Sequence, residues 1–100
     1  MNVERAIRTV VDTGEVILGA KRSIVSVMDK NAKLVIISSN CPKDQKEDLL
    51  HYADLSKVHV YEFEGSSMDL GAVCGKPYVV SMLAVVKAGD SNVFELVRRR

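Results

Sequence analysis

The stretch Lys33–Leu55, KLVIISSNCPKDQKEDLLHYADL, decides the fold of this chain. It opens with four consecutive apolar residues, Leu34–Ile37, of which three are β-branched, and such a run is typical of a strand buried on both faces of a sheet. Small polar residues follow, and Pro42 then leads into a charged segment that reads as a helix start. Polar donors are therefore expected at the carboxyl end of a buried strand, where ligands usually bind in open α/β sheets.

Length and composition predict one domain, residues 1–100, whose 47% hydrophobic residues form a core without disulfide support. The net charge is +1, from 14 basic and 13 acidic residues, so any nucleic-acid surface must be local. Cys41 and Cys74 stand far apart, without C-x-x-C or clustered histidines, which predicts reduced thiols, no metal and no cofactor. We expect no signal peptide and no membrane span, hence a cytoplasmic protein.

Helices and short strands alternate on both sides of this stretch. Apolar spacing predicts an amphipathic helix over Val3–Val11, ended by Gly14 as a left-handed cap. A second helix is expected after Lys21–Ser23, with Ile24, Val27 and Met28 on its inner side. In the helix after Pro42, the expected buried face is Leu49, Leu50, Ala53 and Leu55.

The remaining strands and turns complete a three-layer α/β/α sandwich. Strands are predicted at Glu15–Leu18, Leu34–Ile37, Val58–Phe63 (with lower burial) and Val79–Val86. Ser66 and Asp69 fit a capping box that starts a short helix containing Leu70 and Val73. Val93–Val97 fits either a strand or a helical turn, and Arg98–Arg100 is expected to be a frayed tail.

A glycine between a strand and a helix, Gly19, is followed by the cations Lys21 and Arg22. The single glycine matches neither G-x-G-x-x-G nor G-x-x-x-x-G-K-[ST], so nucleotide binding of those kinds is not supported. Free amides and two cations at one helix start suit a bound phosphate. The alternative is that both side chains merely solvate the surface.

Asn40 stands at the junction between the central strand and its helix. Asparagine at such a junction is most often an N-cap. If Pro42 is the first helical residue, Cys41 occupies the cap position and the Asn40 amide is free to read a base edge. The residues alone leave both roles of Asn40 open.

The segment Gly75–Tyr78 joins a glycine, a cation, a proline and an aromatic ring just before an apolar run. The Tyr78 ring either packs over the edge of the core or offers a platform for an unstacked base. Catalysis is not indicated, because the serines and histidines lack partners at the required spacing. Cys41, near a helix start, would be reactive if its pKa were lowered, but with no base in sequence range the structural interpretation is preferred.

Five motifs in order along the chain carry a family resemblance. They are TGEVILGAKRS at Thr13–Ser23, AKLVIISSNCP at Ala32–Pro42, HYADLSKVHVYEFEG at His51–Gly65, LGAVCGKP at Leu70–Pro77 and VVKAGDS at Val85–Ser91. End to end, the chain resembles the archaeal and eukaryotic large-subunit ribosomal proteins of the L-thirty-e family, within the kink-turn RNA-binding superfamily. The resemblance implies an α/β/α sandwich with a mixed four-stranded sheet, and binding to sharply bent internal loops of large-subunit rRNA.

The resemblance also implies which residues bind RNA. Three loops of the family converge on the RNA, and with the neighbouring cations they correspond here to Gly19, Lys21, Arg22, Asn40, Cys41, Lys43, Lys46, Gly75, Lys76 and Tyr78. Some members have an arginine where Gln45 stands, so that contact would pass to Lys43 or Lys46 or be lost. The Arg98–Arg100 tail matches no family motif.

A non-enzymatic constituent of the large ribosomal subunit is thus the leading expectation, with rRNA and other ribosomal proteins as partners and a monomer in isolation. Two alternatives remain at this point. One is a kink-turn protein of another ribonucleoprotein, such as a guide-RNA particle, and the other is a small α/β module that binds a ligand or a protein. The last of these, the small α/β module, predicts no loss of function when Lys21 and Asn40 are both replaced by alanine.

Overall fold

A four-stranded mixed sheet forms the middle layer of the computed structural model, which describes residues 2–97. The strands are β1 (Glu15–Leu18), β2 (Leu34–Ile37), β3 (His59–Glu62) and β4 (Met82–Lys87). Their order across the sheet is β1-β4-β2-β3, so β2 and β4 are interior and β1 and β3 are the edges. Every residue of β2 is buried, which confirms the interpretation of the Leu34–Ile37 run as a strand covered on both faces.

The pairing gathers several chain reversals at one end of the sheet. β4 is antiparallel to both β1 and β2, and β2 is parallel to β3. In this register Leu18 pairs with Leu83 and Ile37 pairs with Met82. The last residues of β1 and β2 therefore lie beside the first residues of β4, and the last residue of β3, Glu62, lies beside Ile37 of β2. We refer to this end of the strands as the site end of the sheet.

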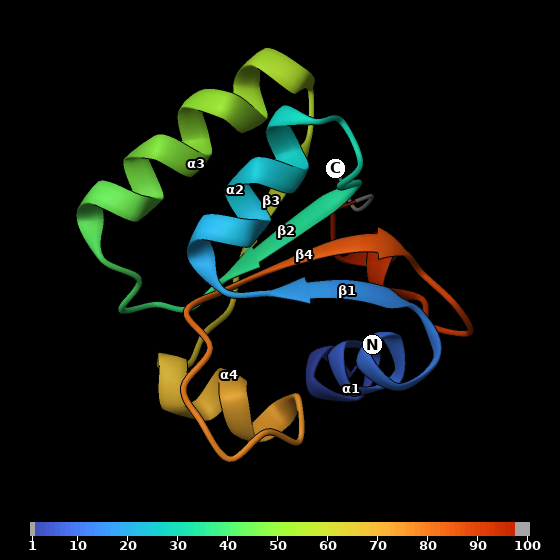
Figure 1. Cartoon of the computed structure of the whole chain (residues 1–100). Helices are drawn as coiled ribbons and strands as arrows, with labels where there is room; N and C mark the ends of the chain where they lie inside the picture. Colours follow the sequence, from blue (N-terminus) through green and yellow to red (C-terminus); the bar gives the residue numbers. More distant parts are fainter. Residues whose placement is uncertain (1, 98–100) are drawn as a thin grey trace.

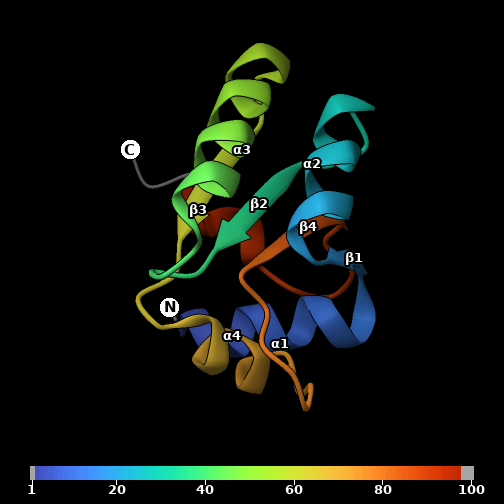
Figure 2. The same cartoon turned by 60° about the vertical axis from the view of Figure 1, so that its left-hand side comes forward.

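Helices cover both faces of the sheet, as the three-layer prediction requires. They are α1 (Val3–Thr13), α2 (Ala20–Met28), α3 (Lys43–Ser56), α4 (Ser67–Val73) and the 3-10 helix η1 (Val93–Val97). α2 and α3 pack on one face, and α1 and α4 lie on the other (Figures 1 and 2). Val93–Val97, for which the sequence left two possibilities, is helical.

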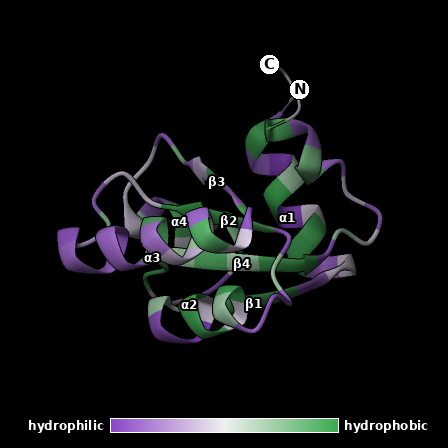
Figure 3. Ribbon diagram, turned by 90° about the horizontal axis from the view of Figure 1, so that it is seen from above, coloured by the Kyte–Doolittle hydropathy of each residue, from purple (hydrophilic) through white to green (hydrophobic). Residues whose placement is uncertain are grey.

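Two apolar cores result, one on each side of the sheet. Ile36, Leu34 and Leu83 face the core under α1 and α4, where Ile7 and Leu70 are fully buried. Val35, Ile37 and Ala84 face the other core, together with Val27 of α2 and Leu49 of α3. In Figure 3 the interior strands β2 and β4 are largely green and lie between helices that carry purple residues, which is the pattern expected for strands covered on both faces.

The chain turns from α1 into β1 at Gly14, whose conformation differs from the prediction. Its backbone is extended (φ −102°, ψ −160°), so it is not a left-handed cap. A Cβ at this position would collide with the carbonyl oxygen of Lys87, so glycine is required by the close approach of the β4 backbone.

The capping box predicted at the start of α4 is confirmed. The Ser66 hydroxyl accepts the backbone N–H of Asp69, and the Asp69 carboxylate accepts the backbone N–H of Ser66.

Several apolar residues predicted to be inside are exposed. Met28 ends α2 and is 49% exposed, whereas Ser23 and Ser26 occupy the inner side of that helix with Val27. Leu50 and Leu55 of α3 are also exposed, because only the side that carries Leu49 and Ala53 contacts the core. None of the helices within residues 2–97 is long and apolar enough to cross a membrane. Arg98–Arg100 lie outside the described residues.

Candidate functional site

Backbone hydrogen bonds tie three junctions together at the site end. The N–H of Gly19, between β1 and α2, donates to the Met82 carbonyl at 2.9 Å. The N–H of Ser38, after β2, donates to the Ser81 carbonyl at 2.9 Å, just before β4. The segments around Gly19, Asn40 and Tyr78, which are far apart in the sequence, thus meet on one edge of the molecule (Figure 1).

Gly19 begins the first of these junctions in a conformation that side chains rarely adopt. Its φ is +106°, and its carbonyl accepts the N–H of Ser23 in the first turn of α2. The helix has no side-chain cap and no acidic residue in its first turn. Lys21 and Arg22 are exposed, and neither forms an ion pair with another described residue. The predicted grouping of cations at an uncapped helix start is therefore present.

The N-cap role weighed for Asn40 is wrong, and its amide is only partly free for the other role, contact with a base edge. α3 starts at Lys43 with Pro42 at its cap position, so Asn40 does not cap this helix and Pro42 is not its first residue. Instead, the Asn40 Oδ1 accepts the N–H of Ser67 at 2.7 Å and the hydroxyl of Ser38 at 3.0 Å. Because a backbone N–H can only donate, the oxygen must face Ser67. Asn40 is exposed, and its Nδ2 donates to no acceptor among residues 2–97.

Cys41 is half-buried behind Asn40. Burial raises the pKa of its thiol, and the nearby Lys46 offsets this only in part. The lowered pKa that a reactive Cys41 thiol would need is therefore not found. Cys74 is buried in the other core, where burial raises its pKa to about 11.

The two lysines at the start of α3 are in different states. Lys43 is exposed and forms no ion pair within the described part of the chain. The ammonium of Lys46 lies 2.7 Å from the carboxylate of Glu62 at the end of β3. That hydrogen bond and the charge of Glu62 raise the Lys46 pKa. The positive charge of Lys46 is therefore partly compensated by Glu62. The side-chain oxygen Oε1 of the neighbouring Gln45 is buried and accepts no hydrogen bond from residues 2–97.

The Gly75–Tyr78 segment completes the site end. Gly75 has φ +76°, and a Cβ there would lie 2.7 Å from a guanidinium nitrogen of Arg8. Tyr78 is 55% exposed, so its ring does not pack into the core. Its carbonyl oxygen lies so close to Gly71 that a larger residue would collide there. Tyr78 and Lys76 line one open hollow with Gly19 and Arg22, so the first and third junctions share a surface.

Some residues of this surface were not identified from the sequence. Arg8 was recognised only as lying off the apolar stripe of α1, yet its guanidinium covers Gly75. Val79 was assigned to a buried strand, but pairing of β4 begins at Met82 and Val79 is 60% exposed beside Tyr78. Ser67 holds Asn40 across 27 positions of sequence, a contact for which no local pattern exists.

Reaction chemistry has no support in this surface. The Ser38 hydroxyl is committed to Asn40, and the carboxylates, histidines and thiols of residues 2–97 form no group of three that could hold a metal ion. The arrangement offers instead exposed cations, an amide donor and an exposed aromatic ring on fixed loops. Such groups contact phosphates and unstacked bases.

Comparisons with known proteins place the chain in a family. Residues 1–95 match the model of the Ribosomal protein L7Ae/L30e/S12e/Gadd45 family. The chain is 50% identical over 97 residues to large ribosomal subunit protein eL30 of Methanothermobacter thermautotrophicus, covering 97% of this chain and 99% of that protein. It is 51% identical over 100 residues to the protein of the same name from Methanocaldococcus jannaschii, covering 100% and 91% of the two chains. The chain therefore belongs to the L7Ae/L30e/S12e/Gadd45 family of ribosomal proteins.

A solved structure shares the fold. A protein of unknown function from Bacillus halodurans superposes with a TM-score of 0.83 over 98% of both chains, at 21% identity. At this identity the likeness supports the three-layer fold alone. The curated relatives are ribosomal proteins and not enzymes, which agrees with the expectation drawn from the sequence.

Proposed function

We propose that this protein is a structural constituent of the large ribosomal subunit in the cytoplasm, and that its site end binds and stabilises a sharply bent (kink-turn) internal loop of rRNA. The ribosomal part rests on family membership and on relatives named large ribosomal subunit protein eL30 at about 50% identity. The bent-RNA part is carried by one observation, the convergence of the Gly19, Asn40 and Tyr78 segments on one edge of the sheet.

In this proposal the cations hold the RNA backbone. Lys21 and Arg22 stand at the start of α2, where free amides also favour an anion, and Lys76 lies across the same hollow. Lys43 extends the positive edge along the start of α3. Two backbones brought together by a bend repel each other, so cations from separate loops that contact both would stabilise the bent form. Binding should therefore weaken as salt rises.

Asn40 and Tyr78 would supply the contacts to bases. With its oxygen held by Ser67 and Ser38, Asn40 offers only its Nδ2 donor, which suits an acceptor on the edge of an unpaired or sheared purine. The exposed Tyr78 ring offers a stacking face for an unstacked base. The protein would thus recognise the shape of the bend and act without chemistry on the RNA.

A gel-shift titration tests this function. The probes are an RNA with a kink-turn flanked by tandem sheared G·A pairs and the same RNA with those pairs replaced by Watson–Crick pairs. We expect tighter binding to the kink-turn, and equal affinity for both RNAs would contradict the proposal. Lys21→Ala/Arg22→Ala should weaken binding. The matched control is Lys30→Ala/Lys33→Ala, since both lysines are exposed and lie before β2, away from the site end.

A further inference from the structure

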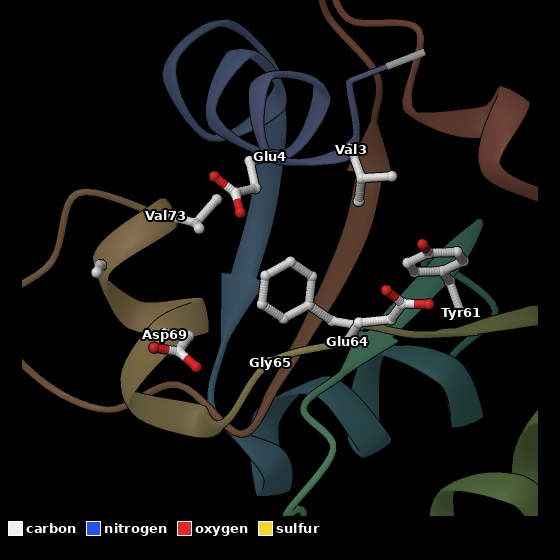
Figure 4. Close-up of a pocket in the computed structure, with 9 residues that line it drawn as sticks. Val3, Glu4, Tyr61, Glu64, Gly65, Asp69 and Val73 are labelled. Carbon is white, nitrogen blue, oxygen red and sulfur yellow. The ribbon is translucent and has the colours of Figure 1, made fainter.

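A second hollow is bordered by the loop that follows β3. It has a volume of about 460 Å³ and lies between the start of α1, the end of β3 and α4 (Figure 4). Buried Phe63 and half-buried Tyr61 give it an aromatic lining, and Val3 and Val73 add apolar surface. A hollow of this size is within the range of ligand sites in proteins.

Carboxylates from three elements surround this hollow. Glu4 comes from α1, Glu64 from the loop after β3 and Asp69 from α4, and all three are exposed. No lysine or arginine of the described chain lines the hollow. The ion pairs found within residues 2–97 use Asp12, Glu62 and Glu15 instead. The hollow therefore carries negative charge that the described cations leave uncompensated.

We propose that this acidic hollow is the docking site for an arginine-containing, basic segment of a partner protein. A guanidinium is planar, so it can lie against the half-buried ring of Tyr61 while its N–H groups pair with the exposed carboxylates of Glu4 and Glu64. Pairing of this kind, with ionised donor and acceptor, is stronger than a neutral hydrogen bond. Asp69 contributes charge, although one of its oxygens already accepts the N–H of Ser66. Phosphate groups are repelled by the same carboxylates, so RNA does not fit this surface.

The hollow adjoins the site end. The carbonyl of Gly65, which lines the hollow, accepts the N–H of Ser39 at 2.8 Å, and the next turn is tied to Asn40 through Ser67. A basic segment docked here would lie beside any RNA held at the site end and could continue onto its backbone. The docking itself uses none of the residues assigned to RNA, so it can be tested with RNA absent and independently of the proposed function.

NMR titration of the full chain with a short peptide tests the inference. The probe is acetyl-Gly-Arg-Gly-Arg-Gly-amide, and the control peptide replaces both arginines with citrulline, which keeps the shape and removes the charge. We expect the arginine peptide to shift the amide signals of Tyr61, Glu64 and Gly65, and the citrulline peptide to leave them nearly unchanged. Glu4→Gln/Glu64→Gln should weaken binding by about fivefold, the size expected for two partly exposed ion pairs.

The matched control variant is Glu47→Gln/Asp48→Gln, which removes the same charge from an exposed part of α3 outside the hollow. Equal weakening by this variant would show a general charge effect and overturn the inference. Absence of shifts at millimolar peptide, or equal shifts with citrulline, would also overturn it. A further variant, Arg98→Gln/Arg99→Gln/Arg100→Gln, tests whether the chain's own three arginines occupy the hollow. If this variant, with no peptide added, moves the amide signals of Glu64 and Gly65, the chain's own arginines fill the hollow and the proposal of a partner protein is overturned.

Discussion

Replacing Asn40 by aspartate separates the internal hydrogen bonds that the structure shows for this side chain from the base contact that we propose for it. Asn40→Asp keeps an oxygen that can accept the N–H of Ser67, now 2.7 Å from the Asn40 Oδ1, and the hydroxyl of Ser38 at 3.0 Å. It replaces the exposed Nδ2 donor by an acceptor. Asn40→Ala removes both the internal hydrogen bonds and the donor, so the pair of variants distinguishes scaffold from recognition.

The expected magnitudes differ between the two variants. Each internal hydrogen bond contributes about 0.5–1.5 kcal/mol, so Asn40→Ala should lower the free energy of unfolding by about 1–3 kcal/mol. Asn40→Asp should change it by less than about 0.5 kcal/mol, because both acceptor interactions survive. Loss of a base-edge contact costs about 1–3 kcal/mol of discrimination. Both variants should therefore lose preference for the kink-turn, by roughly five- to 150-fold.

The assays are urea denaturation for stability and the gel-shift ratio of Kd values for the kink-turn and its Watson–Crick counterpart. Using the ratio removes the general repulsion that the new carboxylate exerts on both RNAs. If Asn40→Asp keeps the wild-type ratio, Nδ2 does not read the RNA and Asn40 is only a tie between loops. If Asn40→Ala unfolds at the wild-type urea concentration, the tie to Ser67 contributes nothing and the assignment of its oxygen is refuted.

Three further predictions concern charge, backbone strain and thiol ionisation. Glu62→Gln should release the ammonium of Lys46 from the carboxylate 2.7 Å away, so that Lys46 can contact an RNA phosphate. The slope of log Kd against log salt concentration should then rise by about one, the size expected for one added phosphate contact. Gly19→Ala should cost about 1–3 kcal/mol in urea denaturation, a loss due to backbone strain alone because nothing lies within 4 Å of the added Cβ at φ +106°. Burial raises the pKa of Cys74 from 9.0 to about 11, so the unfolded chain loses this proton first and stability should fall as pH rises from 9 to 11. Cys74→Ala should remove that part of the pH dependence, and an unchanged profile would contradict the assignment.

The fold was predictable wherever one residue pattern implies one environment. The Leu34–Ile37 run has apolar side chains on both faces, and only an interior strand buries both. The capping box formed by Ser66 and Asp69 is a local pattern that can be recognised without knowledge of tertiary contacts. The alternation of such elements led correctly to three layers, and the mixed sheet followed from the family resemblance.

Other assignments failed because tertiary contacts decide them. Val79 is apolar and close to a strand, but its possible partner strands have ended, with β1 stopping at Leu18 and β2 at Ile37. Residues before Met82 therefore have no ladder to join, and Val79 stays exposed. Leu50 and Leu55 are apolar residues on an outer helix whose buried side is narrow, as only Leu49 and Ala53 are fully enclosed. Hydrophobicity alone does not reveal how wide that side is.

In the candidate site, too, some features were expected from the sequence and others depend on tertiary contacts. The neighbourhood of the Gly19 and Gly75 loops was expected only from the family resemblance, and the structure places Arg22 and Lys76 around one hollow. The bond between Asn40 and Ser67 joins two loops across 27 positions, and the Lys46–Glu62 pair joins a helix to a strand. Neither has a sequence signature, since the spacing of such pairs depends on loop lengths and helix orientation. The sequence therefore did not reveal that the Asn40 oxygen, half of the hydrogen-bonding capacity of its amide, is already used within the protein.

The ties at the site end bear on how the protein would hold a bend. Gly19 is bonded to Met82, Ser38 to Ser81, Ser39 to Gly65, and Ser67 to Asn40. Each bond fixes a loop in the free protein, so less conformational entropy is lost when a ligand binds there. A rigid surface with cations on separate loops favours one backbone path over others, because a straight duplex would leave some of those cations without a phosphate. Specificity for a bend would therefore come from the fixed positions of a few charges and one amide donor, and not from the total charge.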